Sequence, residues 1–146
     1  MDLIELFDRG TRALEEHDSP VTLTRSAELV LKAISNYPTY GVVAASAAAE
    51  RVLGAMMVMS PDLLVGPAKD VVIFDVNLAS GTVLARAAGR LRRSGHDGTI
   101  VAVAIHALCE QTPTSIEGAD GLVVLENSGI REEATQGRDY RILVAH

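Results

Sequence analysis

The stretch that decides the fold of this 146-residue chain is VVIFDVNLASGT, residues 71–82. Its first four residues, Val71–Phe74, are β-branched or aromatic. A continuous apolar run of this kind is typical of a strand buried on both faces, as in a parallel sheet. The run ends at Asp75, and small residues then lead into a helical pattern from Gly81 to Ser94. The stretch therefore predicts a strand that delivers one carboxylate to a sheet edge, followed by a tight turn and a helix.

The same order of strand and helix recurs on both sides of this stretch. An apolar run upstream leads through residues 46–50 into a helix, whereas residues 60–69 contain two prolines and a glycine and predict a loop or short strand. Strand–helix–strand units give a parallel sheet with right-handed crossovers. We therefore expect an α/β fold, a parallel sheet flanked by helices. The other strands expected are Val42–Ala45, Ile100–Ile105, Leu122–Leu125 and Tyr140–Ala145.

Two helices are expected before the sheet. Apolar residues recur at helical spacing over residues 3–16 and again from Leu23 to Ile34, and Ser19 and Pro20 between them suit a helix cap and first turn. Neither helix carries residues that suggest chemistry, so we expect them to serve packing or dimerisation. The chain is expected to form a single domain, with a helical N-terminal element over residues 1–38 and an α/β core over residues 40–146.

Composition narrows the class of protein. The net charge is −6 and 48% of the residues are hydrophobic, which is typical of a folded globular chain. An acidic chain is poorly suited to neutralising phosphates along a nucleic acid. The single cysteine, Cys109, excludes an internal disulfide, and the spacing of the four histidines supports no metal site. The apolar stretches are too short to span a bilayer and no secretory signal is recognisable, so we expect a cytoplasmic protein with no membrane partner.

The turn Ala79–Thr82 has the properties of a phosphate site. Small side chains let an anion approach backbone N–H groups, and the dipole at a helix N-terminus favours negative charge. Thr82 adds a hydroxyl donor, and the Asp75 carboxylate nearby can accept hydrogen bonds from sugar hydroxyls. An ordinary strand-to-helix turn with a capping aspartate is equally compatible with this spacing.

The segment resembles the ribose-phosphate-binding motif of type I phosphoribosyltransferases: a hydrophobic strand, adjacent acids, a turn rich in Thr and Gly, and a helix. Downstream, Val83–Gly95 is similar to the family's next helix and Ile100–Cys109 to its next strand; upstream, GVVAASAAAE (residues 41–50) is similar to its pyrophosphate loop. The resemblance implies a parallel α/β fold of the phosphoribosyltransferase type and a catalytic Asp75 that binds ribose hydroxyls. It also implies a turn around the 5′-phosphate, formed by Ala79, Ser80, Gly81 and Thr82, and a pyrophosphate loop formed by Ser46, Ala47 and Ala48.

This chain departs from the family pattern in three places. Phe74 stands where the first of two acids is expected, alanine replaces glycine in the pyrophosphate turn, and the segment from Ala49 to Asp75 is too short for a catalytic lid. We therefore expect a phosphoribosyltransferase-like protein that binds ribose 5-phosphate or a nucleotide, with transfer of phosphoribosyl to a base left open. Mg²⁺ on the pyrophosphate is expected only if the protein is active, and a homodimer is left open.

Two other hypotheses stay open. The chain is alternatively a non-catalytic module for nucleotide binding, regulation or assembly. It is alternatively a degenerate response-regulator receiver, because Asp75–Leu78 resembles a phosphoacceptor turn and Gly118–Gly121 a late receiver loop. Ala44-Ala45 and Glu126 stand where receivers carry acids and a lysine, which weighs against that hypothesis. His106 ends a strand and suits a base contact or a structural role. On the following helix, Arg86, Arg90 and Arg93 share one face, for which we expect solvent.

Overall fold

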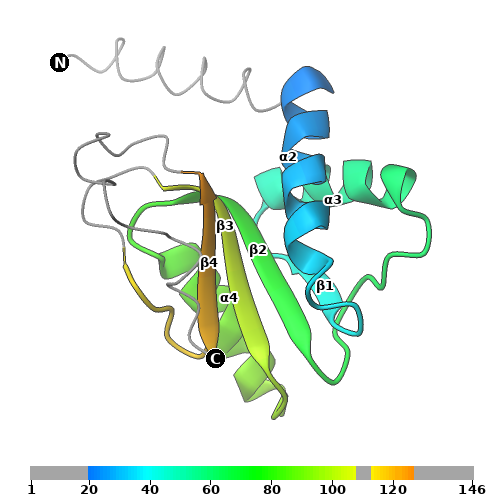
Figure 1. Cartoon of the computed structure of the whole chain (residues 1–146). Coiled ribbons are helices and arrows are strands. Elements are labelled where there is room, and N and C mark those ends of the chain that lie inside the picture. Colours follow the sequence, from blue (N-terminus) through cyan, green and yellow to red (C-terminus); the bar gives the residue numbers. More distant parts are fainter. Residues whose placement is uncertain (1–19, 108–112, 127–146) are drawn as a thin grey trace, which may run out of the picture.

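A four-stranded sheet forms the centre of the molecule (Figure 1). The computed structural model describes residues 20–107 and 113–126. Each strand is parallel to its neighbour. Because the strands run in one direction, their carboxyl ends meet at the same edge. The order across the sheet is β1 (Gly41–Ala44), β2 (Val71–Leu78), β3 (Ile100–Ala107) and β4 (Gly121–Glu126).

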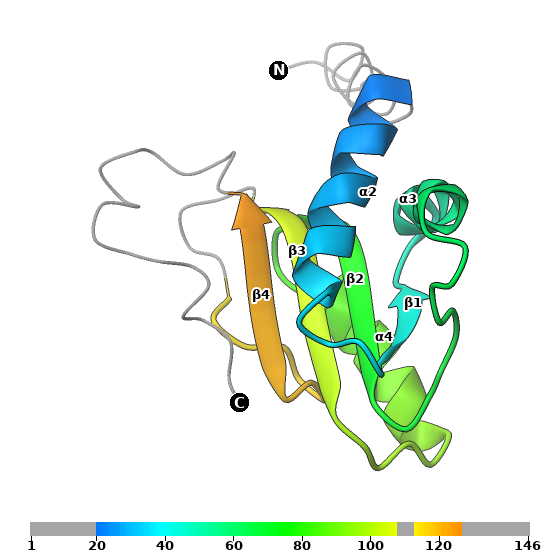
Figure 2. The same cartoon turned by 45° about the vertical axis from the view of Figure 1, so that its right-hand side comes forward.

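Helices cover both faces of the sheet (Figures 1 and 2). Val72, Phe74 and Val76 of β2 belong to the core beneath α2 (Pro20–Ile34) and α3 (Ala47–Met59). Val71 and Ile73, which alternate with them, belong to the core beneath α4 (Thr82–Arg93). Successive side chains of a strand point to opposite faces, so a continuous apolar run supplies both cores. The expected α/β fold, a parallel sheet flanked by helices, is confirmed.

The connection from α3 to β2 passes around the outer edge of β1. Val65 bridges Val42 in parallel, and the Gly66 N–H donates to the Val42 carbonyl at 2.9 Å. The chain then crosses β1 at Gly41, where a Cβ atom would lie 2.0 Å from the Gly66 carbonyl oxygen and 2.8 Å from the Ala68 nitrogen. Segment 60–70 therefore lies along the edge of β1 that faces away from β2, and the chain then passes the start of β1 to enter β2.

β2 extends further than the sequence predicted. The expectation that it ends at Asp75 is wrong, because Asp75, Asn77 and Leu78 are paired with β3. Val76 and Leu78 are both buried, which favours continuing the strand. Asp75 consequently lies within the strand rather than at its end. The helix expected over residues 3–16, Cys109 and the strand expected at 140–145 lie outside the described residues.

No helix of the described part of the chain has the length and hydrophobicity needed to cross a membrane.

Candidate functional site

The carboxyl edge between β1 and β2 is the candidate site. The chain leaves β1 for α3 on one face of the sheet and leaves β2 for α4 on the other face. Where neighbouring parallel strands send their connections to opposite faces, a crevice opens at the strand ends, and ligands of α/β proteins bind there. Two residues singled out from the sequence, Ser46 and Asp75, lie on the two sides of this crevice.

Ser46 and Asp75 are in direct contact. The Ser46 hydroxyl donates to Oδ1 of Asp75 at 2.6 Å, and the Val76 N–H donates to the same oxygen at 2.8 Å. Ser46 also caps α3, because its Oγ accepts from the Ala49 N–H at 3.1 Å. Asp75 is 7% exposed, and its Oδ2 accepts no hydrogen bond from another described residue. The carboxylate therefore links the start of α3 to β2 through one oxygen and keeps the other for a further donor.

The predicted pyrophosphate loop is the first turn of α3. Ala47 is exposed and Ala48 half-buried there, and both contribute only methyl groups. The Ser46 hydroxyl, which is the polar group of this loop, is already engaged with Asp75. The structure therefore brings Ser46 to Asp75, whereas Ala47 and Ala48 do not line the hollow beside the predicted phosphate turn.

The turn before α4 requires glycine at its centre. Gly81 adopts φ +83° and ψ 3°, a left-handed conformation that L side chains rarely adopt. A Cβ atom there would lie 2.9 Å from Cδ1 of Ile116 and 3.2 Å from Cγ of Pro113. Segment 113–116 therefore packs against one side of the turn, and a larger residue at Gly81 would disturb folding as well as any ligand.

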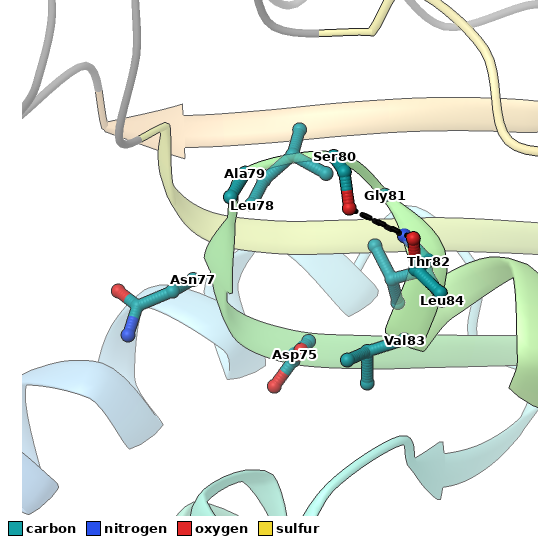
Figure 3. A pocket seen from close by; sticks show the side chains of 9 residues that line it. All are labelled: Asp75, Asn77, Leu78, Ala79, Ser80, Gly81, Thr82, Val83 and Leu84. Carbon is teal, nitrogen blue, oxygen red and sulfur yellow. Dashed lines mark hydrogen bonds between the residues drawn. The ribbon is translucent and has the colours of Figure 1, made fainter.

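Two hydroxyl groups lie together on this turn. Ser80 Oγ and Thr82 Oγ1 are 2.8 Å apart, and the Thr82 N–H donates weakly to Ser80 Oγ at 3.4 Å (Figure 3). Gly81 provides no side-chain cap, and the first turn of α4 contains no acidic residue. The first N–H groups of a helix have no hydrogen-bond partner within the helix. In α4, no carboxylate in the first turn balances the positive end of the helix dipole.

A small hollow adjoins these groups. Its volume is about 90 Å³. Ligand pockets usually enclose roughly 300–1,000 Å³, so this hollow suits one phosphate group rather than a whole nucleotide. Figure 3 shows the Ser80–Thr82 pair on the turn and Asp75 apart from it on β2. The hollow is lined by Asp75, Asn77, Leu78, Ala79, Ser80, Gly81, Thr82, Val83 and Leu84.

An ionic cluster at the far end of the edge was only partly visible in the sequence. His106 Nδ1 lies 3.3 Å from Oε2 of Glu126, and the Arg25 guanidinium donates to Oε1 of the same carboxylate. His106 was recognisable in the sequence but its pairing with Glu126 was not, because the β3–β4 register that places them side by side cannot be read from spacing. The cluster ties α2 to the last two strands.

The donor groups at this edge do not fit the Mg²⁺ that the resemblance implies. Mg²⁺ prefers several oxygen ligands in near-octahedral geometry. The hollow offers one carboxylate, Asp75, with one of its oxygens already engaged. Within residues 20–107 and 113–126, no group of three or more His, Cys, Asp or Glu side chains could hold a metal ion. We therefore derive no step that uses a metal.

No protein-family model, no curated protein and no solved structure matches this chain. Its function has to be argued from the geometry of the sheet edge.

Proposed function

We propose that this chain is a phosphoribosyltransferase-like protein that binds the 5-phosphate of a ribose or nucleotide at the turn Ala79–Thr82. The observation that carries the proposal is the start of α4, which has a hydroxyl pair, no capping side chain at Gly81 and an adjoining hollow of about 90 Å³. Backbone N–H groups and hydroxyls at a helix N-terminus are well suited to a phosphate dianion.

Asp75 supports a sugar attached to that phosphate. It lines the same hollow, and its Oδ2 accepts no hydrogen bond from another described residue. A carboxylate oxygen is a strong acceptor for a ribose hydroxyl, because hydrogen bonds to charged groups contribute more than neutral ones. The resemblance of this strand and turn to the ribose-phosphate motif agrees with that assignment.

Binding is favoured over transfer of the phosphoribosyl group. Phe74, at the position of the family's first acid, is fully buried in the core beneath α2 and α3 and contributes no carboxylate to the edge. Segment 60–70, between α3 and β2, lies along and across β1, where it is hydrogen-bonded to the strand. The proposal is therefore a ligand-binding, non-catalytic role.

The test is calorimetric titration with ribose 5-phosphate. Losing a hydrogen bond to a charged group costs roughly 1.5–3 kcal/mol, so Thr82→Val should weaken binding by about tenfold or more. Thr39→Val, at an exposed threonine remote from the turn, is the matched control and should leave the affinity unchanged. Absence of ribose 5-phosphate binding by the parent protein, or equal affinity of parent and Thr82→Val, would contradict the proposal.

The receiver hypothesis is less well supported. Receivers place acids after the first strand, beside the phosphoacceptor aspartate, whereas β1 ends at Ala44 and Ala45 follows it, so neither position supplies a carboxylate beside Asp75. Glu126, at the position of the receiver lysine, is engaged with Arg25 and His106. Labelling of the parent by acetyl phosphate, lost in Asp75→Asn, would favour a receiver instead.

A further inference from the structure

A second cavity, which we call the α4 groove, runs along the exposed side of α4. Its volume is about 660 Å³, within the roughly 300–1,000 Å³ of ligand pockets. One wall is the face of α4 that carries Arg86, Gly89 and Arg93, and the opposite wall is segment 115–118. Ser80, Gly81 and Thr82, which also line the small hollow, line this groove as well.

The wall opposite α4 is held in place by Arg92. Its guanidinium donates to the Gly118 carbonyl at 3.0 Å, to the Gly98 carbonyl at 2.7 Å and to Oδ2 of Asp120 at 2.9 Å. Gly118 itself approaches the helix so closely that a Cβ atom would lie 3.2 Å from Cβ of Ala88. The two walls are therefore fixed relative to each other, and the groove is formed before any ligand arrives.

The charge of the α4 groove is opposite to that of the whole chain. The protein has a net charge of −6, yet Arg86 and Arg93 line the groove and neither forms an ion pair or hydrogen bond with another described residue. The Arg93 guanidinium lies over Gly89, since a Cβ atom added at Gly89 would be 3.1 Å from Nη1 of Arg93. Arg92 is paired with Asp120, and among the residues that the structure describes Glu117 is the only acid that lines the groove. A cationic groove on an acidic protein attracts anions selectively.

We propose that the α4 groove binds a chain of two or more phosphates, with one phosphate at the Ser80–Thr82 hydroxyls and the others at Arg86 and Arg93. Arginine recognises phosphate through paired, charge-assisted hydrogen bonds. Arg86 follows Thr82 by one helical turn, about 6 Å along the axis, so neighbouring phosphates of one chain can reach both. This inference rests on the proposed function, because both use the turn Ala79–Thr82. It adds that the ligand is a polyphosphate.

The experiment titrates the full chain with tripolyphosphate, ATP, orthophosphate and ribose 5-phosphate. We expect tripolyphosphate to bind at least about tenfold more tightly than orthophosphate, and Arg86→Gln and Arg93→Gln each to reduce its affinity about tenfold. Ribose 5-phosphate binding should stay within about twofold in both variants, since it uses the turn and Asp75 rather than the two arginines. Arg90→Gln is the matched control, because Arg90 is exposed on the same helix but does not line the groove.

Each outcome separates the two proposals. If Arg90→Gln weakens tripolyphosphate binding as much as the groove variants, or if none of the three changes it, the groove assignment is overturned. Binding of ribose 5-phosphate with no preference for tripolyphosphate overturns the groove but keeps the proposed function. Tripolyphosphate binding that depends on Arg86 and Arg93, without any ribose 5-phosphate binding, overturns the proposed function but keeps the groove. Tighter binding of ATP than of tripolyphosphate identifies a nucleotide rather than a free polyphosphate as the source.

Discussion

At the scale of single residues, the two oxygens of Asp75 have different surroundings. Oδ1 accepts from the Ser46 hydroxyl and the Val76 N–H, whereas Oδ2 accepts from no other described residue. The same side chain can therefore stabilise the fold through one atom and meet a ligand through the other. A substitution at Asp75 has to be judged on stability before it is judged on binding.

We expect Asp75→Ala to lower the free energy of unfolding by about 1–3 kcal/mol, because it leaves the buried Val76 N–H and the half-buried Ser46 hydroxyl without this acceptor. Asp75→Asn should cost less, since an amide oxygen can still accept from Ser46 and Val76. Urea denaturation followed by circular dichroism measures both. Unchanged stability in Asp75→Ala would mean that the link between α3 and β2 contributes nothing.

Two glycine substitutions distinguish a glycine that the backbone conformation requires from one that it does not. Gly81→Ala should reduce stability by about 1–3 kcal/mol, because it forces a left-handed residue into contact with Ile116. Gly54→Ala, in α3 with nothing within 4 Å of the added Cβ, should increase stability by about 0.5–1 kcal/mol. Thermal and urea unfolding report both values. Equal stabilisation by the two changes would refute the turn geometry.

Tyr37 gives the protein a pH dependence at the alkaline end. Burial, with Tyr40 adding to it, raises the pKa of Tyr37 above its ordinary value of 10.0. The Tyr37 contribution is complete below pH 10.0, where the hydroxyl keeps its proton in both states, and is lost as pH rises through the higher folded-state pKa. We expect the free energy of unfolding to fall above this pH and to fall less steeply in Tyr37→Phe. Identical slopes in urea titrations from pH 8 to 11 would contradict this account.

At the scale of helices and strands, apolar runs identified most elements but not all their ends. The pattern predicted a helix from Gly81 to Ser94, and α4 spans Thr82–Arg93. The extension of β2 was missed because Asp75, Asn77 and the following small residues are typical of turns. Pairing with β3, which single-sequence patterns do not contain, makes this segment a strand.

Gly41 tests how segment 60–70 passes β1. Gly41→Ala should cost more than about 3 kcal/mol, because a Cβ atom 2.0 Å from the Gly66 carbonyl oxygen requires backbone to move. Gly66, unlike Gly41, has a positive φ, but nothing lies within 4 Å of a Cβ atom added there, so Gly66→Ala should cost only about 1–2 kcal/mol. Equal losses in urea unfolding would show that the crossing is looser than described.

At the scale of the whole molecule, part of the candidate site could be predicted from the sequence. Ala79–Thr82 was recognisable because strand, small-residue turn and helix follow one another directly. The bond from Ser46 to Asp75 and the opposition of segment 115–118 to α4 join distant parts of the chain, and no local pattern encodes them. The three arginines predicted to share one solvated face are all exposed, and two of them, Arg86 and Arg93, also line the α4 groove.

Consecutive residues of β2 supply the layers above and below the sheet in turn. If α4 detached, Ile73 would be exposed to water while Phe74 stayed covered, and the reverse would hold if α2 and α3 detached. Detachment of the helices on either side would therefore expose one apolar face of β2 to water, which costs hydrophobic free energy while releasing little conformational entropy. A ligand bound at the start of α4 would for this reason help to keep Ile73 out of water.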